Sequence, residues 1–99
     1  MTPLEVKPVS KSVINHYVYV LYSTSDYGFY TGYTSNLRQR YGQHRQGKSF
    51  ATKSRLPLKL VYYEVCLSWK DARAREKFLK SGMGKRYLKN RSQDYLTNL

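Results

Sequence analysis

The sequence predicts an α/β (α+β) fold, with a small three-stranded mixed β-sheet flanked by helices in the order ββαβα, or ββαβαα if a short final helix forms. Three observations predict it. Short runs of β-branched and aromatic residues alternate with polar stretches at helical spacing, 40% of the residues are hydrophobic, and 99 residues leave room for one core. A disordered or multidomain chain is therefore excluded.

Residues 1–12 contain proline, lysine and serine without periodicity, so we expect a flexible leader outside the core. The segment 16–23 (HYVYVLYS) is almost continuously β-branched or aromatic, which predicts a strand covered on both faces. The segment 29–34 (FYTGYT) has the same character and follows a short turn, so the two strands should form an antiparallel hairpin.

A first helix is predicted over 37–46, with Ser35 or Asn36 as its N-cap and Gly47 at its end. The polar, basic stretch 48–57 ends in proline and is typical of a surface loop. The segment 58–65 (LKLVYYEV) then predicts the third strand. The helix between the second and third strands indicates a crossover onto the same sheet.

A second helix is predicted over 69–81, opened by Ser68 and Asp71 in the manner of a capping box and ended by Gly82. Residues 84–90 would form the short final helix, and the remainder reads as a polar tail. The expected organisation is a leader at 1–12, one domain at 13–91 and a C-terminal tail at 92–99.

The net charge and the composition indicate which kinds of molecule this protein binds. The formal net charge of +12 favours an extended polyanion, and most cations lie within the predicted domain. The one cysteine, Cys66, excludes an intrachain disulfide framework and a cysteine-based zinc site. The sequence contains no membrane-length apolar run and no nucleotide-binding glycine motif, so we expect a cytoplasmic protein without a membrane partner or a nucleotide cofactor.

The first helix carries two polar residues where a core stripe is expected. At helical spacing the stripe comprises Leu37, Arg40, Tyr41 and His44. Burying a charge or an unpaired imidazole is costly, so one interpretation is a polar cleft. The alternative is that Arg40 extends along the edge of the stripe while His44 caps carbonyl groups in the last turn.

The second helix has a carboxylate, Glu76, inside its stripe of Trp69, Ala72 and Leu79. An inward carboxylate in a chain with only six acidic residues is well placed to hold a divalent metal ion. The alternative is an ordinary ion pair along the helix, with Lys80 four residues later or Arg73 three residues earlier.

Tyrosine is abundant, with 11 residues, and most of these rings must contribute to packing. In the first strand Tyr17, Tyr19 and Leu21 share one face, so some phenols can converge near the first helix. A phenol acts as a base at neutral pH only where nearby cations or a metal favour the phenolate, and Arg40 is a candidate for that role. Gly32 in the middle of the second strand indicates a close approach to its backbone.

Several of these residues also form an ordered set of motifs. Tyr17-Val18-Tyr19 and Tyr30-Thr31-Gly32 precede the helix TSNLRQRYGQH, and the later segments KLVYYE and AREKFLKSG follow in order. Over residues 16–88 the chain resembles small stand-alone members of the GIY-YIG nuclease superfamily. It departs from the motifs at two strand positions, where Tyr17 replaces the first glycine and Thr31 an isoleucine.

The resemblance implies a metal-dependent endonuclease that hydrolyses DNA phosphodiester bonds, structure-selective and linked to DNA repair or recombination. One Mg²⁺ or Mn²⁺ would be held by Glu76. Tyr19 would be the base for the attacking water, with Tyr30 as support or alternate base. Arg40 would contact the scissile phosphate and His44 would orient water or phosphate. The family often has an additional asparagine, for which only Asn90 is available.

Cations on both sides of this expected site would bind DNA through its backbone phosphates. The candidates are Arg38, Arg45, Lys48, Lys53, Arg55, Arg73, Lys77 and Lys80. A protein partner or a homodimer would help such a small domain to select its target. The alternative function is a non-catalytic nucleic-acid-binding module, for DNA or structured RNA, that retains the nuclease fold.

Overall fold

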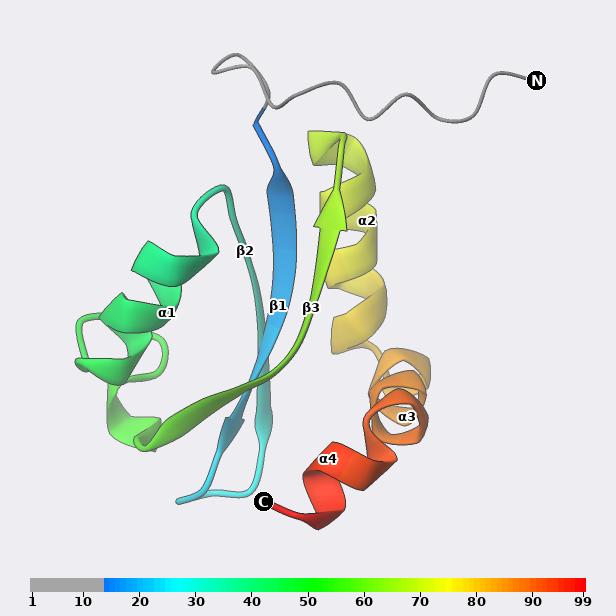
Figure 1. Ribbon diagram of the computed structural model, residues 1–99. Coiled ribbons are helices and arrows are strands. Elements are labelled where there is room, and N and C mark those ends of the chain that lie inside the picture. The colour runs from blue at the N-terminus through cyan, green and yellow to red at the C-terminus, as the bar shows by residue number, and fades with distance from the viewer. Residues whose placement is uncertain (1–13) are drawn as a thin grey trace.

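The computed structural model describes residues 14–99 and confirms the α+β class and the predicted ββαβα order (Figure 1). The predicted leader lies outside the described residues. The elements are β1 (His16–Ser23), β2 (Phe29–Thr34), α1 (Leu37–Arg45), a 3₁₀ turn (Lys53–Arg55), β3 (Leu58–Cys66), α2 (Trp69–Lys80), α3 (Gly82–Arg91) and α4 (Gln93–Thr97). No helix within 14–99 is both long enough and apolar enough to cross a bilayer.

The sheet has the order β2-β1-β3, and both pairs of neighbours are antiparallel. The expectation of a mixed sheet is therefore wrong. The α1 connection does bring β3 back in the same direction as β2, as a crossover requires. However, β1 lies between these two strands, so no parallel pair forms.

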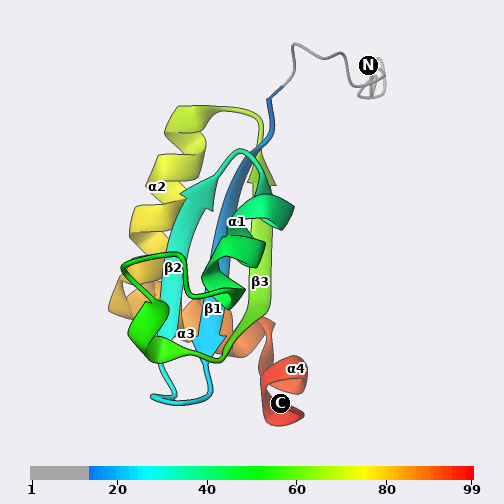
Figure 2. The same ribbon diagram turned by 90° about the vertical axis from the view of Figure 1, so that its left-hand side faces the viewer.

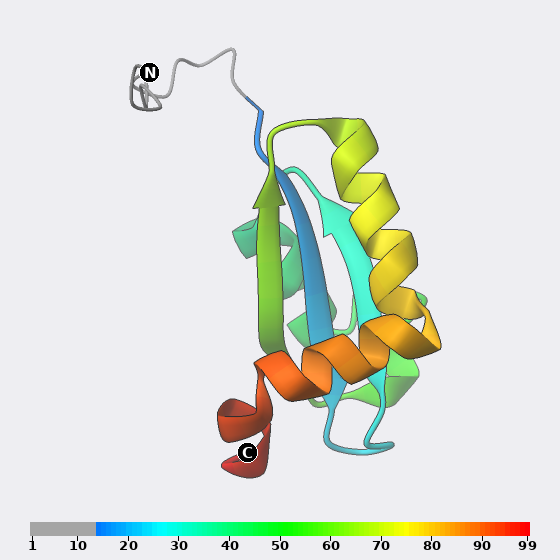
Figure 3. The same cartoon turned by 90° about the vertical axis from the view of Figure 1, so that its right-hand side faces the viewer.

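Helices cover both faces of the sheet. Helix α1 lies against one face (Figure 2), whereas α2 packs on the other and α3 runs across the lower part of that side (Figure 3). Successive side chains of β1 point to opposite faces of the sheet and so contribute to two core layers. Val18 and Val20 face α2, whereas Tyr19 and Leu21 face α1. The α2 layer is completed by Ala72, Leu79 and Leu88.

The helix ends agree with the predictions in part. Asn36 caps α1 by accepting a hydrogen bond from the Gln39 N–H at 3.1 Å, and Gly47 follows the helix with φ of 74°. Ser68 precedes α2, but its side chain makes no cap bond, so the predicted capping box is wrong. An aspartate is one methylene shorter than the glutamate that this motif uses.

The C-terminal residues, predicted as a polar tail, include one more short helix. Residues 93–97 form α4, which begins with Asp94 in its first turn, where a carboxylate favours the positive end of the helix dipole. The Thr97 hydroxyl donates a hydrogen bond back to the Gln93 carbonyl at 2.7 Å. The preceding helix, α3, starts where the Ser81 hydroxyl accepts a hydrogen bond from the Gly84 N–H.

The loop between α1 and β3 is tied to the β1–β2 hairpin. Arg55 Nε donates to Asp26 Oδ2 at 2.5 Å, and the Ser23 hydroxyl donates to the Arg55 carbonyl at 2.6 Å. The Arg55 guanidinium lowers the pKa of Asp26 to about 2. The Thr24 N–H adds a backbone bond to the Pro57 carbonyl. These contacts fix the loop to the hairpin, while most of its side chains stay exposed.

Gly32 allows a tyrosine ring to cross the edge strand. It pairs directly with Tyr19 across the β1–β2 ladder, and a Cβ at position 32 would lie 2.4 Å from Tyr19 Oη and 2.5 Å from its Cζ. The Tyr19 ring therefore leans over β2 instead of standing upright on β1. This agrees with the predicted close approach to the glycine backbone.

Gly32→Ala should consequently force the Tyr19 ring away and destabilise the fold by about 1–3 kcal/mol, the usual cost of overpacking. Urea unfolding followed by circular dichroism would measure the change in the free energy of unfolding. In the Tyr19→Ala background the same substitution should cost much less, because the clashing ring is gone.

Gly42→Ala is the matched control, since a Cβ there meets no atom within 4 Å and alanine favours a helix. It should leave the free energy of unfolding unchanged or raise it. An equal loss of stability for Gly32→Ala with and without the Tyr19 ring would contradict this account of Gly32.

Candidate active site

A chain of hydrogen bonds links β1, α1 and the following loop on one face of the sheet. His44 is fully buried on α1 and uses both ring nitrogens. Its Nε2 lies 2.8 Å from Tyr19 Oη, and its Nδ1 lies 2.7 Å from Thr52 Oγ1. Thr52 is also fully buried. The imidazole therefore lies between two hydroxyl groups, and the two hydrogen bonds together fix the orientation of its ring.

Both titratable members of this chain are neutral near pH 7. Burial lowers the pKa of His44 to about 4, and the nearby positive charge of Arg40 acts in the same direction. Burial also raises the pKa of Tyr19, and this effect outweighs the opposing effect of Arg40. Arg40 does lower the pKa of Tyr19, as expected, but burial raises this pKa by more, so the phenol stays protonated.

Tyr30 closes the cluster from β2. Its ring centroid lies 5.3 Å from that of His44 and 6.4 Å from that of Tyr19. These distances are typical of aromatic packing. The structure therefore brings Tyr19, Tyr30 and His44 together on one face of the sheet.

Arg40 lies beside this cluster and is held from two sides. Its Nη1 donates to Gln43 Oε1 at 3.1 Å, and its Nη2 donates to Ser49 Oγ at 3.3 Å. No carboxylate pairs with Arg40 among residues 14–99. A half-buried guanidinium without a carboxylate partner is suited to an anionic ligand.

The loop residues Ser49 and Thr52 were not identified from the sequence. Each contacts one of the two polar residues of the α1 stripe, and the Thr52 N–H donates to the Ser49 carbonyl at 3.1 Å. The only signal in the sequence is that small hydroxyl residues follow the helix. Hydroxyls in loops more often cap or turn the backbone, so this signal alone has little specificity.

Glu76 comes from α2, on the opposite face of the sheet from α1. It is 9% exposed, and its two carboxylate oxygens accept from Arg73 at 2.8 Å and Lys80 at 3.0 Å. Both of the predicted ion pairs are therefore present. Burial is the main cause of the raised pKa of Tyr19, and the negative charge of Glu76 adds a weaker effect in the same direction.

The cations predicted to bind nucleic acid fall into two groups. Arg55 is paired with Asp26, and Arg73 and Lys80 are paired with Glu76. In the described part of the chain the others have no carboxylate partner. These exposed residues are Arg38, Arg45, Lys48, Lys53 and Lys77. Asn90 is exposed on α3 and lines a hollow with Asp94 and Thr97.

Comparisons with known proteins identify the family of this chain. The model of the GIY-YIG catalytic domain matches residues 15–92. A UPF0213 protein of Pediococcus acidilactici is 41% identical over 80 residues, which cover 75% of this chain and 81% of the relative. A UPF0213 protein of Staphylococcus haemolyticus is 42% identical over 67% of this chain and 80% of its own.

A solved structure shows the same fold. The solution NMR structure of a UPF0213 protein from Bacillus halodurans superposes with a TM-score of 0.54 at 34% sequence identity. The match covers 83% of this chain and 90% of that one. The chain therefore belongs to the GIY-YIG family, among the small single-domain proteins of the UPF0213 group.

Proposed function

We propose that this protein is a divalent-metal-dependent endonuclease that hydrolyses DNA phosphodiester bonds. The observation that carries the proposal is the Thr52–His44–Tyr19 chain beside an arginine without a carboxylate partner. In this arrangement a proton can pass from Tyr19 to His44, and the adjacent Arg40 can bind an anion such as a phosphate. The GIY-YIG catalytic domain and the net charge of +12 support a nucleic acid as the substrate.

The residues present fit a magnesium or manganese ion held by Glu76. Residues 14–99 contain no cluster of three or more histidine, cysteine or acidic side chains, so Glu76 would be the single carboxylate ligand. Mg²⁺ accepts such a site, because it keeps several waters and takes further ligands from substrate phosphates. When bound, the ion would stabilise the charge that develops on the phosphate and the leaving oxygen.

The ion pairs of Glu76 do not prevent this role. The Arg73 and Lys80 side chains are 54% and 55% exposed, so both can turn to solvent, and a metal ion at Glu76 would replace the positive charge that they supply to this buried carboxylate. These two cations can therefore release the carboxylate and turn to the DNA phosphates instead. An incoming phosphate would favour that exchange, since it replaces a carboxylate partner with another anion.

The protein residues move the proton of the attacking water. Because the Tyr19 phenol stays protonated at neutral pH, it accepts a proton from water only as its own proton leaves for His44 Nε2. The neutral imidazole has a free lone pair at Nε2 when Nδ1 carries the proton and donates it to Thr52 Oγ1. The water oxygen then bonds to phosphorus as the bond from phosphorus to the leaving oxygen breaks. The leaving oxygen takes up a proton from solvent, and His44, whose pKa is lowered to about 4, releases its extra proton and becomes neutral again.

Arg40 and Tyr30 complete the site. The Arg40 guanidinium contacts the scissile phosphate and stabilises its transition state, as its two donor groups suit paired oxygens. Tyr30 packs against His44 and limits the access of water to the imidazole. The exposed cations around α1 hold the DNA backbone without reading its bases.

Glu76→Gln should abolish cleavage while DNA binding stays equal or becomes tighter. The substitution removes the proposed metal ligand and also a negative charge close to the phosphate. We expect a loss in rate of about 10²–10³-fold or more, from the several kcal/mol that a metal supplies. The assay uses labelled duplex, single-stranded, flapped and four-way-junction DNA with Mg²⁺, with Mn²⁺ and with a chelator.

Asp71→Asn is the matched control, because it removes the same charge from an exposed position in the first turn of α2. It should leave cleavage within about twofold of the wild type. Full activity of Glu76→Gln would refute the metal assignment. Binding without cleavage of every substrate by the wild-type protein would instead favour a non-catalytic nucleic-acid-binding module.

Thr52 acts as a positioning residue, so Thr52→Val should lower kcat by about 10- to 100-fold, the usual effect of losing such a support. Without the hydroxyl, Nδ1–H has no acceptor and the imidazole shifts to the tautomer protonated at Nε2. Thr52→Ser keeps the hydroxyl and should keep most of the activity. The ¹⁵N chemical shifts of His44 report the tautomer directly, and an unchanged tautomer in Thr52→Val would contradict this role.

The lowered pKa of His44 makes stability depend on pH. The unfolded chain binds a proton at this residue below pH of about 6.5, whereas the folded protein resists protonation down to about 4. The neutral imidazole thus contributes its full stability above pH 6.5, and this contribution falls as the pH decreases towards 4. The total loss is of the order of 3 kcal/mol.

Urea unfolding at a series of pH values between 4 and 7 measures this dependence. The comparison is with His44→Asn, which has no titrating group at this position and should lack this part of the slope. Equal slopes for the two proteins would show that His44 is not the buried neutral group described here.

A further inference from the structure

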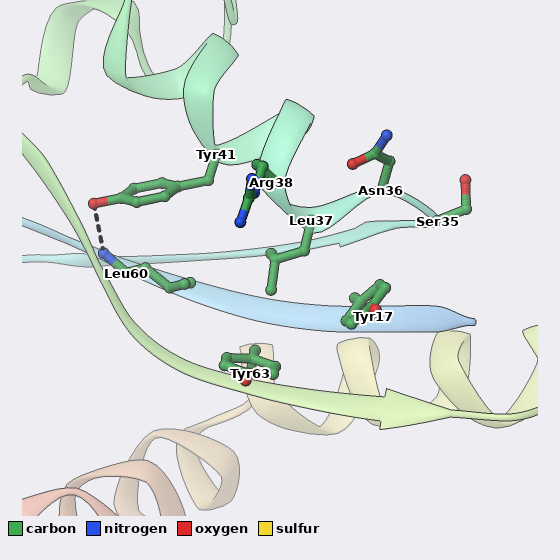
Figure 4. Close-up of a pocket in the computed structure, with 8 residues that line it drawn as sticks. All are labelled: Tyr17, Ser35, Asn36, Leu37, Arg38, Tyr41, Leu60 and Tyr63. Carbon is green, nitrogen blue, oxygen red and sulfur yellow. Dashed lines mark hydrogen bonds between the residues drawn. The ribbon is translucent and has the colours of Figure 1, made fainter. Parts of the chain in front are cut away.

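A basic, aromatic groove runs along the other flank of α1. Its first part has a volume of about 520 Å³ and lies between α1 and the sheet, with Tyr17 and Tyr63 on the sheet below Leu37 and Arg38 (Figure 4). A second hollow of about 490 Å³ continues it past Lys59. The two parts share Tyr41 and Leu60, so they form one groove between α1 and β3.

The groove is separate from the hydrogen-bonded cluster. The Tyr19 ring leans towards β2 over Gly32, whereas the groove is lined by β3 on the opposite side of β1. Both nevertheless lie on the α1 face of the sheet. Tyr17 and Tyr19 are two residues apart on one strand face, so their Cα atoms are separated by about 7 Å.

Two tyrosine rings, tilted by 54° relative to each other, form the floor of the groove. Tyr63 is 53% exposed, and the centroids of the Tyr17 and Tyr63 rings are 6.4 Å apart. Tyr41 is fixed at the side, where the Leu60 N–H donates to its hydroxyl at 3.3 Å. The exposed Tyr63 ring beside the half-buried rings of Tyr17 and Tyr41 forms an aromatic surface of the kind that marks a binding site.

The rim of the groove is positive. Arg38, Tyr41 and Arg45 occupy one side of α1 at spacings of three and four residues, and Lys59 adds a third cation from β3. None of these cations is in an ion pair within the described chain. No carboxylate from residues 14–99 lines either part of the groove.

We propose that this groove binds a single-stranded segment of DNA, with unpaired bases on Tyr17 and Tyr63 and phosphates on Arg38, Arg45 and Lys59. Aromatic faces accept any unpaired base, whereas a duplex keeps its bases stacked inside and offers only phosphates. The inference rests on the proposed nuclease function and deepens it. It assigns as substrate a DNA with unpaired nucleotides next to the scissile phosphate, such as a single-stranded flap.

Fluorescence anisotropy in the presence of a chelator tests the groove without any cleavage. The probes are a labelled 20-nucleotide oligo(dT) and a blunt hairpin duplex of equal charge. The wild-type protein should bind oligo(dT) more tightly than the duplex. Tyr63→Ala should weaken oligo(dT) binding by about 5- to 100-fold, the effect of losing one stacked base, and change duplex binding less than twofold.

Tyr27→Asn is the matched control for the ring. Tyr27 is 76% exposed at the hairpin turn and has φ of 59°, a conformation that asparagine tolerates. This variant should bind oligo(dT) like the wild type. The triple substitution Arg38→Gln, Arg45→Gln and Lys59→Gln should reduce the salt dependence of oligo(dT) binding by about 2 in log–log slope.

Equal oligo(dT) affinity for Tyr63→Ala and the wild type would overturn the proposal. So would sedimentation showing that Tyr63→Ala converts a dimer into a monomer, because the groove would then hold a second copy of the chain. Failure of the nuclease function is seen separately in the Mg²⁺ cleavage assay. A groove that binds oligo(dT) in a protein that cuts nothing would refute only the catalytic proposal.

Discussion

Burying an imidazole in a small domain costs little only when both ring nitrogens have hydrogen-bond partners, and His44 obtains them from two separate parts of the chain. The Tyr19 hydroxyl reaches His44 because Gly32 leaves space above β2. Thr52 reaches it from the other side because the loop is tied to the hairpin through Arg55 and Asp26. The bond network thus fixes the height of α1 above the sheet and the path of the loop at the same time.

The chain has only six acidic residues, so each carboxylate determines which of the many cations are paired. Asp26 joins the loop to the hairpin through Arg55, and Glu64 joins β3 to α2 through Arg75, which donates to it at 2.6 and 2.9 Å. The Arg75 guanidinium also keeps the pKa of Glu64 below its usual value. Arg55 and Arg75 therefore link separate elements of the fold. The cations on the outer side of α1 have no carboxylate partner within the described residues and remain available to a polyanion.

The sequence predicted those features that depend on local composition. The bounds of β1 and β2 are confirmed because uninterrupted β-branched and aromatic runs are strong local signals. The inward positions of His44 and Glu76 follow from helical periodicity and are also confirmed. The strand order and the partners Ser49 and Thr52 depend on contacts between distant segments, which no local pattern encodes. The exposed ring of Tyr63 could likewise not be told from the packing tyrosines in the sequence, because its exposure depends on how distant segments pack.

The central position of β1 has a consequence for how the chain folds. β1 is the first strand made, yet its pairing with β3 needs residues some forty positions later, and its α2 face stays uncovered until α2 has been synthesised. An isolated two-stranded hairpin is marginally stable in water, so β1 and β2 alone do not form a lasting nucleus. The sheet and its two helical layers must therefore form in one cooperative late step. Until that step, the apolar strand VYVL is exposed on the nascent chain, which is the stage at which the protein is most open to aggregation and to chaperone binding.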